Sequence, residues 1–360
     1  MECKKNTKAV LLPKFMQRVI QTLSRWYNLE LRDLPWRHTR DPYKIWISEV
    51  ILQQTRVAQG IGYYERFIAA MPNVSALSHA SEQEVLKLWQ GLGYYSRARN
   101  LHFAAKQVMD EFHGVFPSNY TDILRLRGVG KYTAAAIASF AFGEKVPAID
   151  GNVKRVGARF FGLHDAIHTS LFEKSLFSLL FEAIQGADPN IFNQAMIEVG
   201  ATLCLPQNPR CEICPLSECC VARLQNLQKQ IPVVVKKQKP IAKHFYYLCI
   251  QKGNRWAFAL PRNQGIWQGM VEFPMVEGLE GGMDLDGVLA SAGVVDNFSV
   301  LSERTFTHQL THQTIYATCW YLCLSGDKFV SPVDWQWCDL EEIQRLPLHR
   351  LMEKMIKFTL

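Results

Sequence analysis

The sequence contains no long hydrophobic run. Its longest stretch of small apolar residues, 134–142, is interrupted by Ser139 and is far too short to span a bilayer. Near the start of the chain, Pro13 cuts short the first apolar segment, so we expect no signal peptide. These absences argue against a membrane or secreted protein. We therefore expect a cytoplasmic (nucleoid) location if the source is bacterial, and a nuclear one if it is eukaryotic.

Disulfide bonds are not expected either, although the chain has 10 cysteines, because cytosol and nucleus keep thiols reduced. Four of the cysteines lie close together as Cys204-x6-Cys211-x2-Cys214-x5-Cys220, and Cys219 is an adjacent fifth. Such a compact loop of thiols indicates a metal site. Thiolates alone serve either zinc or an iron–sulfur cluster, but zinc sites usually consist of two well-separated Cys-x2-Cys pairs.

The length and net charge of the chain indicate how many domains it has and what kind of partner it binds. The chain has 360 residues, which is long for one domain, so two domains are expected. A hydrophobic fraction of 48% and a mean hydropathy of -0.07 describe a globular protein with a proper core. The 40 Lys and Arg residues against 33 Asp and Glu give a net charge of +7, which favours a polyanionic partner.

The stretch 124–150 predicts two helices joined by a tight Gly-Val-Gly turn. Gly128 and Gly130 allow a backbone that residues with a Cβ resist, and the alanine-rich segment 131–142 starts a helix directly after them. A helix that begins on glycines presents free N–H groups and suits a phosphate. An ordinary helical hairpin has the same turn. Here a short apolar, strand-like segment leads on to Asp150, which favours a functional site.

A second carboxylate stands out earlier in the chain. Asp41 and Pro42 predict the start of a helix that runs to Arg56. Within this helix Glu49 has apolar neighbours one turn away on both sides, so it does not lie wholly on a polar face. It is either a charge at the edge of the apolar stripe or a carboxyl in an apolar pocket. In a pocket its pKa would be raised, so that it could donate a proton near neutrality. Asp150 likewise is either a helix N-cap or a catalytic group, and the two roles do not exclude each other.

The remaining segments define the domain organisation. Two glycines, two tyrosines and two arginines in residues 91–99 predict a loop that could insert a ring into stacked DNA, although such residues also occur on plain surfaces. Residues 224–240 form an extended basic linker. The pattern beyond the linker indicates an α/β domain, with a hairpin over 245–261, a loop over 265–274, a helix over 284–292, a strand over 315–324 and helices over 340–358.

With both halves in view, the chain resembles the MutY family of adenine DNA glycosylases, a branch of the endonuclease III-related helix-hairpin-helix superfamily. The resemblance covers nearly all of residues 10–225 and, more loosely, 240–350. In the first part it rests on Leu34-Pro35-Trp36-Arg37, Ser48-Glu49-Val50-Ile51-Leu52-Gln53-Gln54-Thr55, Gly91-Leu92-Gly93-Tyr94-Tyr95, the hairpin, Asp150-Gly151-Asn152 and the cysteine loop. In the second it rests on Leu260-Pro261-Arg262, the loop before Glu272-Phe273-Pro274 and Phe306-Thr307-His308.

The resemblance implies an α + α/β fold. An all-helical helix-hairpin-helix glycosylase domain is expected over residues 10–225, with the hairpin at 120–142 and a 4Fe–4S cluster loop at 204–220. A linker is expected at 226–240. A nudix-like α/β domain that recognises 8-oxoguanine is expected over 241–360.

The resemblance also assigns roles to single residues. Glu49 is the acid that protonates the adenine ring, Asp150 stabilises or traps the sugar cation, and Tyr132 and Asn152 hold these two carboxyls. The expected substrate and DNA contacts are Trp36, Arg37 and Gln194 in the adenine pocket, Gln54 and Tyr94 as wedges at the mispair, Gly128, Gly130 and Lys131 at the hairpin, and Phe306, Thr307 and His308 at 8-oxoguanine. Threonine stands where the family's Phe-Ser-His triplet has serine. The 4Fe–4S ligands are Cys204, Cys211, Cys214 and Cys220.

The implied activity is monofunctional removal of adenine mispaired with 8-oxoguanine or guanine in double-stranded DNA, by a monomer that does not bind membranes. The alternative is an endonuclease III-type glycosylase and AP lyase acting on oxidised pyrimidines, but the lysine that such an enzyme needs is replaced by Tyr132. A nudix hydrolase is not expected, because residues 265–293 lack its G-x5-E-x7-R-E-x2-E-E-x-G box. A non-catalytic DNA-binding protein would keep the hairpin and cysteines without needing Glu49 and Asp150 together.

The cysteine spacing gives a first test. We expect a yellow-brown protein with about four irons per chain, the stoichiometry of a four-thiolate cluster. Cys220→Ser should lose the iron, whereas the matched variant Cys219→Ser should keep it, because only Cys220 preserves the x5 spacing. Iron analysis and visible absorbance of anaerobically purified protein measure this. Zinc in place of iron would contradict the cluster.

Overall fold

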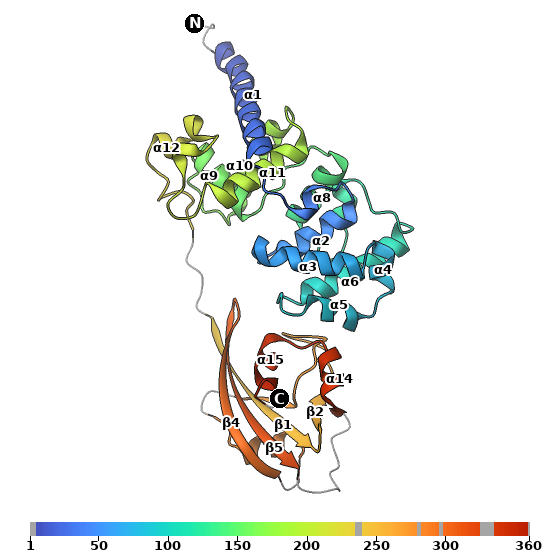
Figure 1. The fold of residues 1–360 in the computed structure, drawn as a ribbon. Coiled ribbons are helices and arrows are strands. Elements are labelled where there is room, and N and C mark those ends of the chain that lie inside the picture. The colour runs from blue at the N-terminus through green and yellow to red at the C-terminus, as the bar shows by residue number, and fades with distance from the viewer. Residues whose placement is uncertain (1–4, 235–239, 279–281, 295–297, 325–334, 359–360) are drawn as a thin grey trace. The chain divides into compact units, whose positions relative to one another are not determined.

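The computed structural model describes the chain apart from residues 1–4, 235–239, 279–281, 295–297, 325–334 and 359–360 (Figure 1). The chain forms two compact units. The first comprises Met1–Ser78 and Phe103–Lys236, and the second comprises His79–His102 and Lys237–Leu360. Most of the predicted linker precedes residue 235, and its lysines at 236, 237 and 239 lie outside the described residues. Among the described helices, none is both long and apolar enough to cross a membrane.

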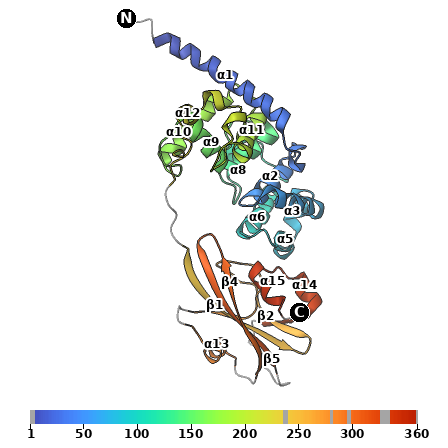
Figure 2. The same ribbon diagram turned by 60° about the vertical axis from the view of Figure 1, so that its left-hand side comes forward.

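The first unit is helical. Helix α8 packs against both α2 and α11, and α9 packs against α11, so these four helices form its centre. In both ribbon views α9 to α12 group together, whereas α2 and α3 lie apart from them (Figures 1 and 2). The helices of this unit are α1 (Lys5–Glu30), α2 (Pro42–Leu52), α3 (Val57–Ala70), α4 (Val74–His79), α7 (Tyr120–Leu124), α8 (Lys131–Phe142), α9 (Gly151–Phe161), α10 (Ser170–Ile184), α11 (Pro189–Thr202) and α12 (Val221–Leu224). Three short 3-10 turns, Pro35–Arg37, Cys211–Ile213 and Ser217–Cys219, and the end of α6 (Ser96–Glu111) complete the described elements of this unit.

Aspartates fix the starts of the helices that matter for the site. Asp41 accepts a hydrogen bond from the backbone N–H of Tyr43 and caps α2, as the sequence predicts. The expectation that this helix runs to Arg56 is wrong, because it ends at Leu52. The next residues leave the helical conformation, and Gln54 has a φ of 60°, a left-handed backbone that is uncommon without glycine.

The predicted hairpin is present, with two differences. Helix α8 spans Lys131–Phe142 as expected, and Gly128 has the positive φ, 78°, that favours glycine. Gly130 instead has a φ of -90°, which any residue adopts, so the expected need for glycine there is wrong. Residues 146–149 form no strand, since the Asn193 side chain satisfies their backbone. It accepts from the N–H of Ala148 and donates to the carbonyl of Val146.

The second unit contains one mixed sheet. Its described strands are β1 (Ile241–Lys252), β2 (Arg255–Ala259), β3 (Met275–Gly278), β4 (Phe298–Gln309), β5 (Gln313–Leu324) and β6 (Trp335–Cys338). In the described part of the chain their order is β4-β5-β1-β2-β6, with β3 pairing to β1, and only β1 and β5 pair in parallel. The hairpin of β1 and β2 was predicted. Strands β4 and β6 were not, because neither shows a clear apolar alternation.

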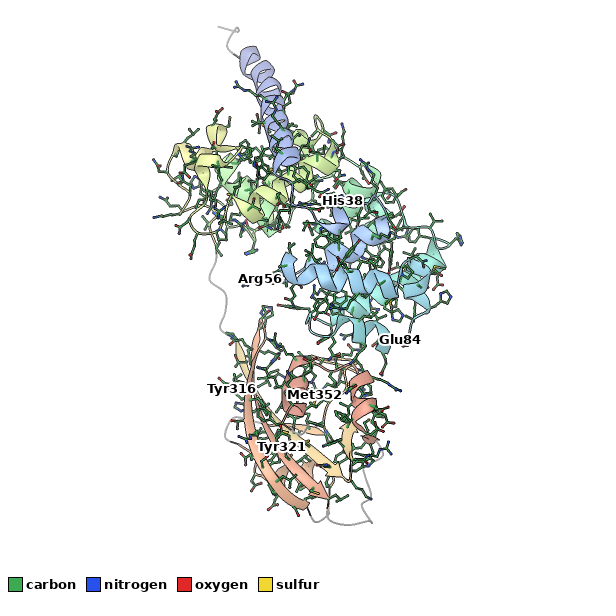
Figure 3. All side chains as sticks on the ribbon, viewed as in Figure 1. His38, Arg56, Glu84, Tyr316, Tyr321 and Met352 are labelled. Atoms are coloured by element: carbon green, nitrogen blue, oxygen red, sulfur yellow. The ribbon has the colours of Figure 1, made fainter. Side chains whose placement is uncertain are left out.

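Helices cover both faces of this sheet. Residues 245–250 of β1 are all buried, which explains their continuous apolar run. One face packs against α13 (Leu285–Ser291), while Tyr321 on the other face donates a hydrogen bond to the carbonyl of Met355 in α15 (Arg350–Ile356). Figure 3 labels Tyr321 on β5 together with buried Met352 of α15. The remaining helices of this unit are α5 (Glu82–Trp89), the start of α6 (Ser96–Glu111) and α14 (Leu340–Arg345).

A close crossing of α9 and α11 generates a stability test. A Cβ added to Gly200 of α11 would lie 2.5 Å from the Cβ of Asn152 and 3.1 Å from its Cα. Since backbone atoms cannot move aside as a side-chain tip can, Gly200→Ala should lower the free energy of unfolding by about 1–3 kcal/mol. The control Gly62→Ala, inside α3 and facing only the flexible tip of Arg66, should raise it by about 0.5–1 kcal/mol. Denaturant unfolding measures both, and equal effects would contradict the crossing.

Candidate active site

A cavity of about 430 Å³ lies at the junction of α2, α8, α9 and α11 in the first unit. It gathers eight of the residues singled out from the sequence: Trp36, Arg37, Glu49, Gln54, Tyr132, Asp150, Asn152 and Gln194. The hairpin glycines Gly128 and Gly130 do not line it. Lys131 lines a different cavity. The sequence motifs, which are spread over more than 150 residues, therefore converge on one site.

Glu49 is the buried carboxyl of this cavity, with 7% of its surface exposed. Burial and, to a smaller extent, the negative charge of Asp150 raise its pKa from 4.5 to about 7, against a hydrogen bond with Tyr132 and the charge of Arg37. Tyr132 is partly buried, and the loss of water around its phenol, together with the nearby charge of Glu49, raises its pKa well above 10. Near neutrality the phenol is therefore a permanent hydrogen-bond donor. Glu49 is therefore a carboxyl in a buried pocket, one of the two alternatives that the sequence left open, and not a charge at the edge of an apolar stripe.

Asp150 has a different environment. It caps α9 by accepting a hydrogen bond of 2.7 Å from the N–H of Val153, and its other oxygen accepts one of 2.8 Å from the Asn152 side chain. Burial raises its pKa, while these hydrogen bonds and the charge of Arg155 oppose the rise. The cavity thus holds two carboxyls in different surroundings, because Asp150 accepts hydrogen bonds from Val153 and Asn152 whereas Glu49 is buried beside Tyr132.

Arg155 ties Asn152 in place, a role that the sequence did not suggest. Its guanidinium donates to the Asn152 side chain and to the carbonyl of Gly200, both at 2.8 Å, and to the carbonyl of Cys204 at 2.7 Å. One side chain therefore connects the group that holds Asp150 to the start of the cysteine loop. Its i+3 spacing from Asn152 was the available sequence signal.

A buried ion cluster supports the opposite wall. Glu198, 1% exposed, binds Arg32 at 2.8 Å and Arg37 at 2.6 Å. Burial disfavours its charge, but the bonds from the two arginines outweigh burial, so its pKa is lowered. One turn earlier on α11, Gln194 accepts a hydrogen bond of 2.9 Å from the Tyr27 hydroxyl. Arg32, Glu198 and Tyr27 were missed, although Glu198 follows Gln194 at i+4, the spacing of one helix face.

The four predicted metal ligands, Cys204, Cys211, Cys214 and Cys220, line one small cavity, and Cys219 does not. Buried Arg159 donates to the Cys204 sulfur at 3.4 Å and also to the carbonyls of Leu205, Pro206 and Ile231. Within the described residues, no three His, Cys, Asp or Glu side chains converge as a site for a single metal ion.

The remaining predicted residues belong to the second unit. Tyr94 and His308 line a cavity of about 520 Å³, whereas Phe306 and Thr307 do not. All three residues of the triplet lie on β4, where alternation turns Thr307 to the face opposite His308. Burial lowers the pKa of His308 to about 4, so its imidazole is neutral near pH 7. Tyr94, like Gln54, has a positive φ, 49°.

The HhH-GPD superfamily of base excision DNA repair proteins matches residues 47–182, and the NUDIX domain matches residues 245–358. The adenine DNA glycosylase of Buchnera aphidicola subsp. Baizongia pistaciae is 36% identical over 94% of this chain and 97% of its own length. The chain belongs to the adenine DNA glycosylase family.

Solved structures place the family's helical part among related folds. A thermostable thymine-DNA glycosylase is 32% identical, covers 59% of this chain and 99% of its own, and superposes with a TM-score of 0.53. A trapped endonuclease III–DNA covalent intermediate is 22% identical over 59% of this chain and 98% of its own, with a TM-score of 0.51. The predicted helical glycosylase fold followed by a nudix-like domain is confirmed.

Two carboxyls that line one cavity, one protonatable near neutrality and the other held at a helix cap, are suited to acid catalysis combined with charge stabilisation. Glu49 can carry a proton near neutrality, and Asp150 can offer a negative charge from its helix cap. The Tyr132 phenol stays neutral near pH 7 and forms a hydrogen bond with Glu49, so it can hold this carboxyl without adding a charge to the cavity.

The raised pKa of Glu49 predicts a pH-dependent stability difference. Below pH 4.5 Glu49 is protonated in both folded and unfolded chains, whereas between pH 4.5 and 7 the unfolded chain loses this proton first. Stability is therefore lost as pH rises through this window. Glu49→Gln removes that loss and should be more stable than wild type by on the order of 3 kcal/mol above pH 7, with no gain below pH 4.5.

Glu198→Gln is the control for this experiment, because the pKa of Glu198 is lowered and its charge is bound by two arginines. That variant should be less stable than wild type near neutrality. Denaturant unfolding at several pH values measures both. A Glu49→Gln difference that does not change with pH would contradict the raised pKa.

Proposed function

We propose that this protein is a monofunctional DNA glycosylase that removes adenine mispaired with 8-oxoguanine or guanine in double-stranded DNA. The observation that carries the proposal is the pairing of protonatable Glu49 with capped Asp150 across one buried cavity. We infer that the base removed is adenine from the relationship to adenine DNA glycosylases. Such chemistry serves base excision repair in the nucleoid or the nucleus.

Glu49 acts as the general acid. Adenine cannot be reached inside a duplex, so it must be flipped into the cavity. Neutral adenine is a poor leaving group, and a proton delivered to its ring lowers the barrier to departure. Since burial brings the pKa of Glu49 to about 7, a large share of molecules hold this proton at neutral pH. The Tyr132 hydroxyl orients the carboxyl through its hydrogen bond.

Asp150 stabilises the sugar. Loss of the base leaves an oxocarbenium-like cation, and a carboxylate on the sugar side lowers its energy or traps it covalently. Asn152 and the N–H of Val153 hold the carboxylate in a fixed position. Water then completes hydrolysis, with Glu49, now deprotonated, as the base that activates it.

Trp36, Arg37 and Gln194 form the adenine pocket in this proposal. Tyr27 and Asn190 hold the Gln194 amide by hydrogen bonds on either side. An amide so held offers one donor and one acceptor, the pattern that matches the N6 and N7 edge of adenine. Gln54 extends from its strained backbone at the rim of the same cavity.

The absence of an amine in the lining supports a monofunctional enzyme. Strand cleavage through a Schiff base requires a lysine within bonding reach of the sugar. None of the described residues that line this cavity is a lysine, and Lys131 lines another. The Tyr132 phenol cannot form an imine. The lyase alternative therefore lacks its nucleophile.

The cysteine loop is proposed to hold a 4Fe–4S cluster. The four cysteines with the predicted spacing line one small cavity, so together they can supply the four thiolates that such a cluster requires. When bound, the cluster supplies a cross-link between thiolates, and Arg159 offsets negative charge at Cys204.

We assign recognition of the opposite base to the cavity of the second unit, through His308 and Tyr94. A neutral imidazole both donates and accepts hydrogen bonds, and the exposed Tyr94 ring, 47% accessible, offers a stacking face. Thr307 lies on the other face of β4, so replacement of the family's serine at this position should leave this cavity unchanged.

A glycosylase assay tests the whole proposal. Wild type should release adenine from a duplex with adenine opposite 8-oxoguanine, and the strand should break only after alkali. Glu49→Gln should bind the duplex with similar affinity but lose activity by about 10²–10⁴-fold, the usual value of acid catalysis. Single-turnover rates with and without alkali measure this. Strand cleavage at the rate of adenine release without alkali would favour the lyase alternative, and near-normal turnover by Glu49→Gln would refute its role.

A further inference from the structure

The first unit contains a second cavity, of about 610 Å³, that the proposed chemistry does not use. It lies between the starts of α8, α9 and α10, and we call it the Phe177 cavity. Pro147, Ile149 and Leu176 give it an apolar floor. Tyr132 lines both this cavity and the active-site cavity, so the two meet at the residue that holds the catalytic acid. Its volume suits a ligand of the size of a nucleotide.

The rim of the Phe177 cavity is positively charged. Lys131, Lys154 and Lys174 line it, against a single acidic residue, Glu173. Lys154 is already paired with Glu173 at 2.5 Å. Among the described residues, Lys131 and Lys174 have no ion-pair partner within 4 Å, while the charge of Lys131 acts on Glu173 at longer range. With three lysines against one glutamate, the lining keeps a net positive charge. Such a rim favours an anion.

An exposed aromatic ring completes the cavity. Phe177 is 43% exposed although it is a large apolar side chain, and its ring stacks on Phe181 at 5.8 Å with an interplanar angle of 16°. Phe181 is equally exposed, at 44%, but does not line the cavity. A solvent-facing ring beside unpaired lysines is the combination with which proteins bind single-stranded nucleic acid, where bases stack and phosphates meet cations.

We propose that the Phe177 cavity holds the nucleotide next to the flipped adenine on the same DNA strand, with its base against Phe177 and its phosphate beside Lys131 and Lys174. This inference rests on the proposed function, since a flipped adenine in the active-site cavity brings its neighbour to Tyr132. Flipping removes one stacking partner of that neighbour. The Phe177 ring replaces the lost partner and so stabilises the extruded state.

The aromatic contact is tested with a matched pair of variants. Phe177→Ala should weaken binding about tenfold to a duplex with a non-hydrolysable adenosine analogue opposite 8-oxoguanine, as expected for the loss of one base–aromatic stack. Phe181→Ala loses the same ring stack from an equally exposed position, and should leave affinity unchanged. Equal melting temperatures would show that both variants are folded.

Two further readouts locate the contact. A 2-aminopurine base next to the adenosine analogue, placed on its 5′ or 3′ side in turn, should be quenched by wild type and Phe181→Ala but not by Phe177→Ala at one of the two positions. Lys174→Ala should reduce the slope of log affinity against log salt by about 0.9, the value of one lost phosphate contact. Lys106→Ala, an exposed lysine of α6 outside both cavities, should leave the slope unchanged.

The outcomes separate this inference from the proposed function. If wild type releases adenine, but Phe177→Ala matches Phe181→Ala in affinity and neither 2-aminopurine position responds, the Phe177 cavity does not hold the neighbouring nucleotide and the proposed function stands. If wild type releases no adenine from the mispair, the proposed function itself fails. A tenfold loss confined to Phe177→Ala, with quenching lost at one position, supports the inference.

Discussion

The contact between α9 and α11 at Gly200 is the constraint on which the candidate site depends. There the backbone of one helix meets Asn152 on the other, at a distance that leaves no room for a side chain. This contact fixes Asn152, which in turn holds Asp150, while Arg155 reaches from the same helix to the carbonyls of Gly200 and Cys204. The carboxylate of the active site and the entrance to the cysteine loop are therefore positioned by one helix crossing.

The position of Glu49 also depends on α11, through a series of packed helices. It comes from α2, which packs on α8, and α8 in turn packs on α11. The burial that raises its pKa is produced by these packed helices rather than by a partner charge, because the largest contribution is the loss of water around the carboxyl. The raised pKa of Glu49 is thus a consequence of how the helices of this unit pack.

Much of the fold could be predicted from the sequence, because strong local signals carried it. Asp41 before Pro42, the glycine turn before Lys131 and the cap at Asp150 each mark a helix start through residues close to it in the sequence. Strand β4 was missed because it is largely exposed and lacks an apolar alternation. The residues that hold the site, Arg155 and Glu198, were missed because their partners lie far away in the sequence or are backbone carbonyls. Sequence patterns therefore identify candidate reactive residues more easily than they identify the residues that hold those side chains in place.

Burial of Glu49 links its proton to whatever enters the cavity. With a pKa of about 7, the folded protein at neutral pH is divided between a protonated and an ionised form. A ligand that carries phosphate charges repels the ionised form, so its binding draws a proton from solution. By thermodynamic reciprocity, protonation strengthens the binding of that ligand to the same degree. DNA would then generate the acidic form of the active site as it binds, and a neutral ligand of the same shape would not.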